Sequence, residues 1–163
     1  MGNLGKRFTD PNIWEKPFFT DFNIDQRLYW NYITHRCDQA GVFQINYPVD
    51  SAFTGLAVDR DFIKEFAEQA NKDRERIRPL EGRRLWLVNF ISFQQGEALS
   101  AKSPPHVSIV KKLREHGIFK TAAKEQPKLF ENYTNKQKDP DPAKKDTKPY
   151  SKGKERVSEG LAK

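Results

Sequence analysis

The stretch RIRPLEGRRLWLVNF, residues 76–90, decides the fold. Ile77 and Leu80 lie before a tight turn that contains Gly82, and the apolar run 85–88 lies after it. Short apolar runs joined by a glycine turn predict a β-hairpin. Pro79 has no backbone N–H to donate, so the first strand of this hairpin is expected at an edge of its sheet.

Helical and strand patterns surround the hairpin. Upstream, the spacing of apolar residues predicts helices at 24–39, 48–54 and 59–70, and alternation over 42–46 predicts a strand. The helix at 59–70 has a one-sided apolar stripe, formed by Phe62, Ile63, Phe66, Ala67 and Ala70. Downstream, residues 105–116 predict a final helix that ends at Gly117.

The resulting order is helix, strand, helix, helix, strand, strand, helix. This order predicts the α+β class and describes a winged helix-turn-helix. The helices at 48–54 and 59–70, with a turn at Gly55 between them, form the expected helix-turn-helix pair. The 76–90 hairpin is the expected wing.

Charge is distributed unevenly along the 163 residues, which contain 29 Lys and Arg against 22 Asp and Glu. Residues 1–118 hold 17 basic and 15 acidic residues, whereas 119–163 hold 12 basic and 7 acidic residues with few aromatics. A polar, proline-containing segment cannot bury enough apolar surface to offset the entropy of ordering it. We therefore expect a flexible N-terminus at 1–12, a folded domain at 13–118 and a disordered basic tail at 119–163. A short helix before Pro127 is compatible with this tail.

The 20 aromatic residues show that part of the chain packs a core. Five of them have two interpretations, stacking on exposed bases or burial in the core, and they are Trp14, Phe18, Phe19, Trp30 and Trp86. Because aromatic side chains favour burial, we expect all five to belong to the core. Phe90, Phe93 and Gln94 are expected to pack the final helix onto the hairpin.

Several classes of protein are disfavoured by what the sequence lacks. A single cysteine excludes an intramolecular disulfide framework and suits a reducing cytosol. No apolar run approaches the roughly 18 residues of a membrane span. His35, Cys37 and Asp38 lie close together, but residues two apart on a helix point in different directions, so no metal site is expected. Without a phosphate loop or a nucleophile motif, neither an enzyme nor a cofactor is expected.

Spaced motifs in the chain resemble those of a known family. The opening of that family's module is similar to this chain at Trp14, Lys16, Phe18-Phe19 and Asp21 and in the run from Cys37 to Phe43. The close of the module is similar to this chain in the run from Trp86 to Gln94 and in the spacing of Pro105-His106, Ile109, Leu113 and His116-Gly117-Ile118. The chain is thus similar, over residues 13–118, to the winged-helix N-terminal domain of phage and prophage replication-initiation proteins of the replisome-organiser type. The resemblance implies a winged helix that binds double-stranded DNA and helps to start phage DNA replication in the bacterial host cytoplasm. Many members carry a second C-terminal domain for recruitment, whereas a polar segment follows here.

In a winged helix, the second helix of the pair enters the major groove and the hairpin contacts the backbone or the minor groove. Two cations on that helix and a basic strip from 72 to 84 are the candidate DNA-binding residues, namely Arg60, Lys64, Lys72, Arg74, Arg76, Arg78, Arg83 and Arg84. The strip alternates with Asp73, Glu75 and Glu81, so a solvated charged face remains an alternative.

Two other functions remain open. Acidic residues on the 59–70 helix and the small net charge of 1–118 favour an adaptor that recruits a helicase loader. A phage transcriptional regulator with the same fold is a further alternative.

Overall fold

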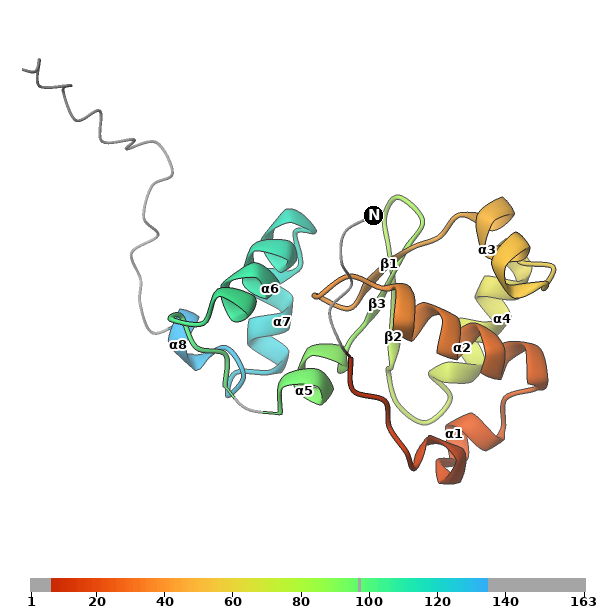
Figure 1. Ribbon diagram of the computed structural model, residues 1–163, viewed down its shortest axis with the longest axis horizontal. Helices are drawn as coiled ribbons and strands as arrows, with labels where there is room; N and C mark the ends of the chain where they lie inside the picture. Colours follow the sequence, from red (N-terminus) through yellow and green to blue (C-terminus); the bar gives the residue numbers. More distant parts are fainter. Residues whose placement is uncertain (1–6, 97, 135–163) are drawn as a thin grey trace, which may run out of the picture.

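A three-stranded antiparallel sheet lies between two groups of helices in the computed structural model, which describes residues 7–96 and 98–134 (Figure 1). This mixture of helices and sheet has the α+β class that the sequence predicts. The elements are a 3-10 helix at Ile13–Glu15, α1 at Pro17–Thr20, α2 at Ile24–Arg36, β1 at Val42–Gln44, α3 at Tyr47–Thr54, α4 at Arg60–Ala70, β2 at Ile77–Leu80, β3 at Arg84–Leu87, α5 at Phe90–Gln95, α6 at Pro104–Glu115, α7 at Phe119–Glu125 and α8 at Glu131–Thr134.

The helices begin and end where local sequence signals place them. Asn23 accepts a hydrogen bond from the backbone N–H of Gln26 at 2.8 Å, and the side-chain oxygen of Gln26 accepts one from the backbone N–H of Asn23 at 3.1 Å, so a capping box starts α2. Asp59 caps α4 in a similar way, by accepting from the N–H of Phe62 at 2.8 Å. Gly117 adopts a φ of +73° after α6, where a left-handed residue allows the backbone to satisfy the last carbonyls of the helix.

The predicted hairpin is confirmed, and its strands take the order β1-β3-β2. Ile77 lies opposite Leu87 and Pro79 lies opposite Leu85, while β1 pairs with the other side of β3. β2 is therefore an edge strand, as Pro79 predicts.

Successive side chains of the central strand enter two separate cores. Leu85 and Leu87 belong to a core with α1, α2 and α4, and Trp86 belongs to a core with α6 and α7. This alternation is what the pleat of a strand produces. Because both faces of β3 are covered, the run from 85 to 88 is apolar throughout.

A buried carboxylate fixes α3 against α2. Asp50 is 2% exposed and accepts hydrogen bonds from the hydroxyl of Tyr32 at 3.0 Å and from the backbone N–H of Asn46 at 3.1 Å. The hydroxyl of Tyr29 lies 3.3 Å from the same carboxylate, and burial beside that charge raises the pKa of Tyr29. A buried polar group with several partners holds two helices in one arrangement.

The prediction of a tail that begins at residue 119 is wrong for residues 119–134. Helix α7 occupies the stretch before Pro127, where a short helix was compatible with the sequence, and Phe130 is completely buried against α7 and the sheet. The backbone N–H of Leu99 donates to the carbonyl of Leu129 at 2.8 Å, which closes the second core. A few apolar residues are enough to fold residues 119–134 onto the second core, because they pack on the apolar surface that Trp86 provides. Residues 135–163 lie outside the part of the chain described.

The expected flexible N-terminus is also corrected for residues 7–12, whereas residues 1–6 lie outside the described part. The Arg7 guanidinium donates to the carbonyl of Thr34 at 2.9 Å and to Cys37. Phe8 exchanges two backbone hydrogen bonds with the side-chain amide of Gln94. Gln94 therefore holds the N-terminal segment, and does not join the final helix to the hairpin as expected.

The aromatic expectations are confirmed for most of the cluster. Phe18, Phe19 and Trp86 are buried, and Trp30 packs against Phe18 with ring centroids 5.2 Å apart. Trp14 is 60% exposed, and it only touches the edge of the core through Phe19. The expectation that Trp14 is a core residue is therefore wrong.

The short helix α5 was not expected. Gly96 ends it with a φ of +69°. Phe90 packs partly on the first core, whereas Phe93 is 47% exposed, so neither packs the final helix onto the hairpin as the sequence led us to expect.

Candidate nucleic-acid interface

The exposed side of α4 carries both signs of charge. Its apolar residues face the first core, so Arg60 and Lys64 lie at the surface together with Asp61, Glu65 and Glu68. The Lys64 ammonium is 4.0 Å from the Glu68 carboxylate, with both side chains largely exposed. A phosphate backbone that approached α4 would meet more carboxylates than cations, so α4 alone is a weak electrostatic site.

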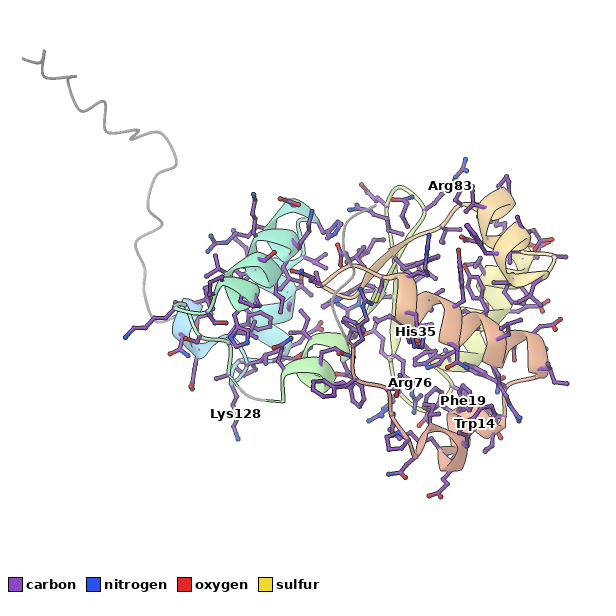
Figure 2. All side chains as sticks on the ribbon, in the orientation of Figure 1. Trp14, Phe19, His35, Arg76, Arg83 and Lys128 are labelled. Carbon is purple, nitrogen blue, oxygen red and sulfur yellow. The ribbon has the colours of Figure 1, made fainter. Side chains whose placement is uncertain are left out.

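Arg83 lies at the tip of the hairpin. Gly82 and Arg83 have φ values of +74° and +56°, and the left-handed region is unusual for a residue other than glycine. The side-chain amide of Gln44 donates to the carbonyls of both residues, at 2.9 and 3.2 Å, and Ile45 donates its N–H to the second. These bonds hold the turn, from which the Arg83 side chain extends into solvent (Figure 2). Its guanidinium also lies 5.7 Å from the centroid of the Tyr47 ring.

Arg76, in contrast, is a structural residue. It is 8% exposed, lies 3.9 Å from the centroid of the Phe18 ring and donates to the carbonyl of Ala70 at 2.9 Å. Its Nη2 donates to the Asp73 carboxylate at 2.9 Å, and this hydrogen bond lowers the pKa of Asp73 to about 2. A guanidinium with these partners is not available to a phosphate.

Arg78 joins the hairpin to the C-terminal helices. It donates to Glu75 at 2.7 Å, forms an ion pair with Glu125 of α7 at 3.0 Å and lies 5.1 Å from the centroid of the Trp86 ring. Hydrogen bonding to Glu75 raises the pKa of Arg78, and the same bond lowers the pKa of Glu75. Arg78 therefore stabilises the contact between β2 and α7.

Arg84 also has internal partners. Its Nε donates to the carbonyl of Glu81 at 2.7 Å, and its Nη1 lies 3.0 Å from Nδ1 of His116. Nε2 of His116 is in turn 2.6 Å from the Asp38 carboxylate. A ring protonated on Nε2 satisfies both contacts, and this chain of side chains joins β3, the end of α6 and the loop before β1.

Lys72 and Arg74 lie in the loop between α4 and β2. The Lys72 ammonium is 3.6 Å from the Asp21 carboxylate, and both side chains are exposed, so the pair is weak. Arg74 is exposed and makes no side-chain hydrogen bond or ion pair with any of the described residues.

The structure thus divides the eight predicted residues. Arg60, Lys64, Arg74 and Arg83 remain at the surface, and Lys72 remains there in a weak pair. Arg76, Arg78 and Arg84 are engaged in the fold. The exposed ones are spread over α4, the following loop and the hairpin tip, and do not form one continuous strip.

The C-terminal helices carry a basic surface that the sequence interpretation missed. Residues 1–97 contain 13 Lys and Arg against 14 Asp and Glu, whereas residues 98–134 contain 7 against 3. A division at residue 118 hides this difference because it separates α6 from α7. Counting charge with α6 and α7 together is the signal that would have found it.

A hollow of about 200 Å³ lies between the N-terminal segment, α2 and α5. Its walls are mostly apolar and include Phe18, Trp30 and Phe90, and Arg74 and His35 also line it. Arg76 lines the hollow as well, and both His35 and Arg76 are labelled in Figure 2. The volume suits a single ring or side chain, and nothing among the described residues identifies an occupant.

Metal and thiol chemistry find little support in the described residues. In residues 7–96 and 98–134, no three His, Cys, Asp or Glu side chains are grouped as a metal site requires. Cys37 is completely buried, and burial raises the pKa of its thiol to about 11. Within the same residues, no helix combines the length and the hydropathy needed to cross a bilayer.

No protein-family model matches the chain, and neither the curated proteins nor the solved structures provide a significant match.

Proposed function

We propose that the protein binds double-stranded DNA and that residues 24–87 are a winged helix-turn-helix. The observation that carries the proposal is topological. Helix α2 is followed by β1, α3, α4 and the β2–β3 hairpin, and β1 pairs with the far side of β3. In this arrangement α3 and α4 are the helix-turn-helix pair, and the hairpin is the wing.

The proposal assigns different contacts to α4 and to the wing. Recognition helices contact base edges through residues near their N-terminus, where α4 presents Arg60 and Lys64. The wing tip presents Arg83, whose position is fixed by the bonds from Gln44 and Ile45. Arg76, Arg78 and Arg84 are left out of the interface because their guanidinium groups have partners within the fold.

For the biological role we propose the initiation of phage or prophage DNA replication. The support is the resemblance of residues 13–118 to winged-helix domains of replication-initiation proteins. A transcriptional regulator is the alternative with the same fold. Mapping the bound site separates the two, because an origin supports replication and a promoter supports regulation.

Titration of a labelled duplex with the full chain at several salt concentrations tests the DNA proposal. Binding that weakens as salt rises is expected, since cations that contact phosphates displace counterions. Arg83→Ala should weaken binding roughly fivefold, equivalent to about 1 kcal/mol. Lys16→Ala, which removes a cation paired with Asp10 beside α1, is the matched control and should leave the affinity unchanged. Equal losses in the two variants would remove the wing from the interface.

The acidic side of α4 favours a second candidate, a protein-interaction adaptor for a helicase loader. Asp61, Glu65 and Glu68 are exposed there, and like charges would repel a phosphate backbone. Glu65→Lys with Glu68→Lys separates the candidates. Loss of binding to a purified helicase loader supports the adaptor, whereas tighter duplex binding with no effect on the loader supports DNA.

A further inference from the structure

Helix α7 places lysines on the side that faces away from the sheet. Ala122 and Ala123 are buried in the second core, so Lys120 and Lys124 lie on the opposite, exposed side of the helix. Residues four apart are neighbours on a helix surface. Lys128 follows in the loop after α7 and projects away from the fold (Figure 2).

Helix α6 packs in the same core as α7. Its buried residues Ile109, Val110 and Leu113 belong to the core that also buries α7, so the exposed sides of both helices point away from the sheet. Lys111 is exposed on this outer side. The Arg114 guanidinium lies 5.0 Å from the centroid of the Phe119 ring, which connects the end of α6 to the start of α7. Lys111, Lys120, Lys124 and Lys128 are called the α6–α7 surface below.

The acidic residues described in this region form no ion pair with the four lysines, although the charge of Lys111, after the hydrogen bond from Lys112, helps to lower the pKa of Glu115. Glu115 pairs with Lys112 at 2.7 Å, and Glu125 pairs with Arg78 of β2 at 3.0 Å. Among residues 7–96 and 98–134, no carboxylate lies within 4.0 Å of an ammonium of the α6–α7 surface. The sequence from 135 to 163 is itself basic, with nine Lys and Arg against five Asp and Glu. Its net charge therefore has the same sign as that of the four lysines.

Lys120 and Lys124 have no ion-pair partner among the described residues. Like charges four residues apart destabilise a helix slightly, so Lys120 and Lys124 repel each other. No exposed hydrogen bond or ion pair among the described residues compensates for this repulsion. Uncompensated local repulsion is typical of residues whose role lies in binding.

The chemistry of the surface favours a phosphate backbone over a lipid headgroup. A helix that lies on a membrane presents apolar side chains beside its lysines, and the exposed side of α6 offers only Val107. Exposed lysines that form no ion pair and have few apolar neighbours suit the closely spaced phosphates of a duplex. These contacts are insensitive to base sequence, because phosphates carry no sequence information.

We propose that the α6–α7 surface is a second DNA contact, at which Lys111, Lys120, Lys124 and Lys128 bind the phosphates of a duplex independently of sequence. The inference rests on the proposed DNA binding and adds a surface on the other side of the sheet from α4 (Figure 1). Four phosphate contacts contribute about −3.6 to the slope of log K against log salt, at roughly −0.9 per contact.

The test is the salt dependence of binding to a duplex of random sequence, measured for the full chain. Lys120→Ala with Lys124→Ala should make the slope about 2 units less steep, because two phosphate contacts are lost. The thermal midpoint should not fall, because the repulsion is removed and alanine favours helix. The matched control is Lys16→Ala with Arg36→Ala, which removes the same charge from two exposed or half-exposed cations outside the proposed interface, one paired with Asp10 and the other lying over the Phe53 ring. Its slope should match that of the wild type.

Each other outcome overturns the inference. An unchanged slope in the α7 variant, with normal wild-type binding, contradicts this surface and leaves the proposed function intact. Equal changes in both double variants indicate a general effect of net charge. Salt-sensitive self-association that is lost in the α7 variant, with unaltered DNA binding, identifies a second copy as the partner. A wild type that binds no duplex contradicts the proposed function as well.

Discussion

Arg78 of β2 and Glu125 of α7 form an ion pair with an N–O distance of 3.0 Å, and the same guanidinium lies 5.1 Å from the centroid of the Trp86 ring. The pair joins the outer strand of the sheet to a helix 47 residues later in the chain. A cation that the sequence assigns to DNA thus holds the C-terminal helices on the sheet.

Arg78→Ala should lower the free energy of unfolding by about 1–2 kcal/mol, because a half-buried ion pair and a cation–π contact are both lost. Arg74→Ala is the control and should change it by less than about 0.5 kcal/mol, since Arg74 is exposed. Urea unfolding measures both. Equal effects would show that Arg78 has no structural role.

Phe130→Ala should cost about 3–4 kcal/mol of unfolding free energy, because it leaves a cavity beside α7 in the second core. Phe93→Ala should cost less than about 1 kcal/mol, since its side chain is 47% exposed. A Phe130→Ala cost below about 0.5 kcal/mol would contradict the extension of the fold to residue 134.

Gly41→Ala should destabilise the fold by about 2–4 kcal/mol. Gly41 has a φ of +78°, and an added Cβ would lie 2.7 Å from Cβ of Phe90 and 3.1 Å from the carbonyl oxygen of Leu87. Gly55→Ala is a matched control, with a φ of +74° and open space around the added Cβ. It should cost about 1 kcal/mol, from backbone strain alone. Similar costs at the two positions would show that the close approach at Phe90 is absent.

Stability should depend on Asp73 at acid pH. Its pKa is lowered from 3.8 to about 2 by the hydrogen bond from Arg76, so the folded state favours the charged form. The contribution is therefore fully present above pH 3.8 and is lost as the pH falls towards 2. Thermal midpoints of the wild type and Asp73→Asn should differ most near neutral pH and converge over this interval. A difference in thermal midpoint that stays constant as the pH falls from 3.8 to about 2 would contradict the lowered pKa of Asp73.

Local sequence signals predicted the elements around the hairpin well. Asn23, Asp59 and Gly117 act through their own neighbours, and Pro79 places β2 at an edge, so each could be interpreted without tertiary structure. The burial of Phe130 was not predictable in this way. It depends on an apolar surface at Trp86, more than 40 residues earlier.

The candidate site was less predictable than the fold. Arg60 and Arg83 are exposed as the sequence interpretation requires, but nothing in the strip from 72 to 84 distinguishes Arg74, which points to solvent, from Arg76, which packs on Phe18. Charged side chains that alternate along a strand and the loop before it face different neighbours. Only the tertiary contacts show which of these side chains form hydrogen bonds, ion pairs or ring contacts within the fold. The α6–α7 surface was missed because the expected domain boundary passed between its two helices.

Equilibrium binding of the full chain to duplex DNA, followed from about 50 to 200 mM salt, tests the central claim most directly. Four lysine–phosphate contacts together with the proposed wing contact predict binding at the lowest salt and a linear fall of log K against log salt, with a slope of about −3.6 or steeper. Absence of duplex binding at about 50 mM salt would contradict it.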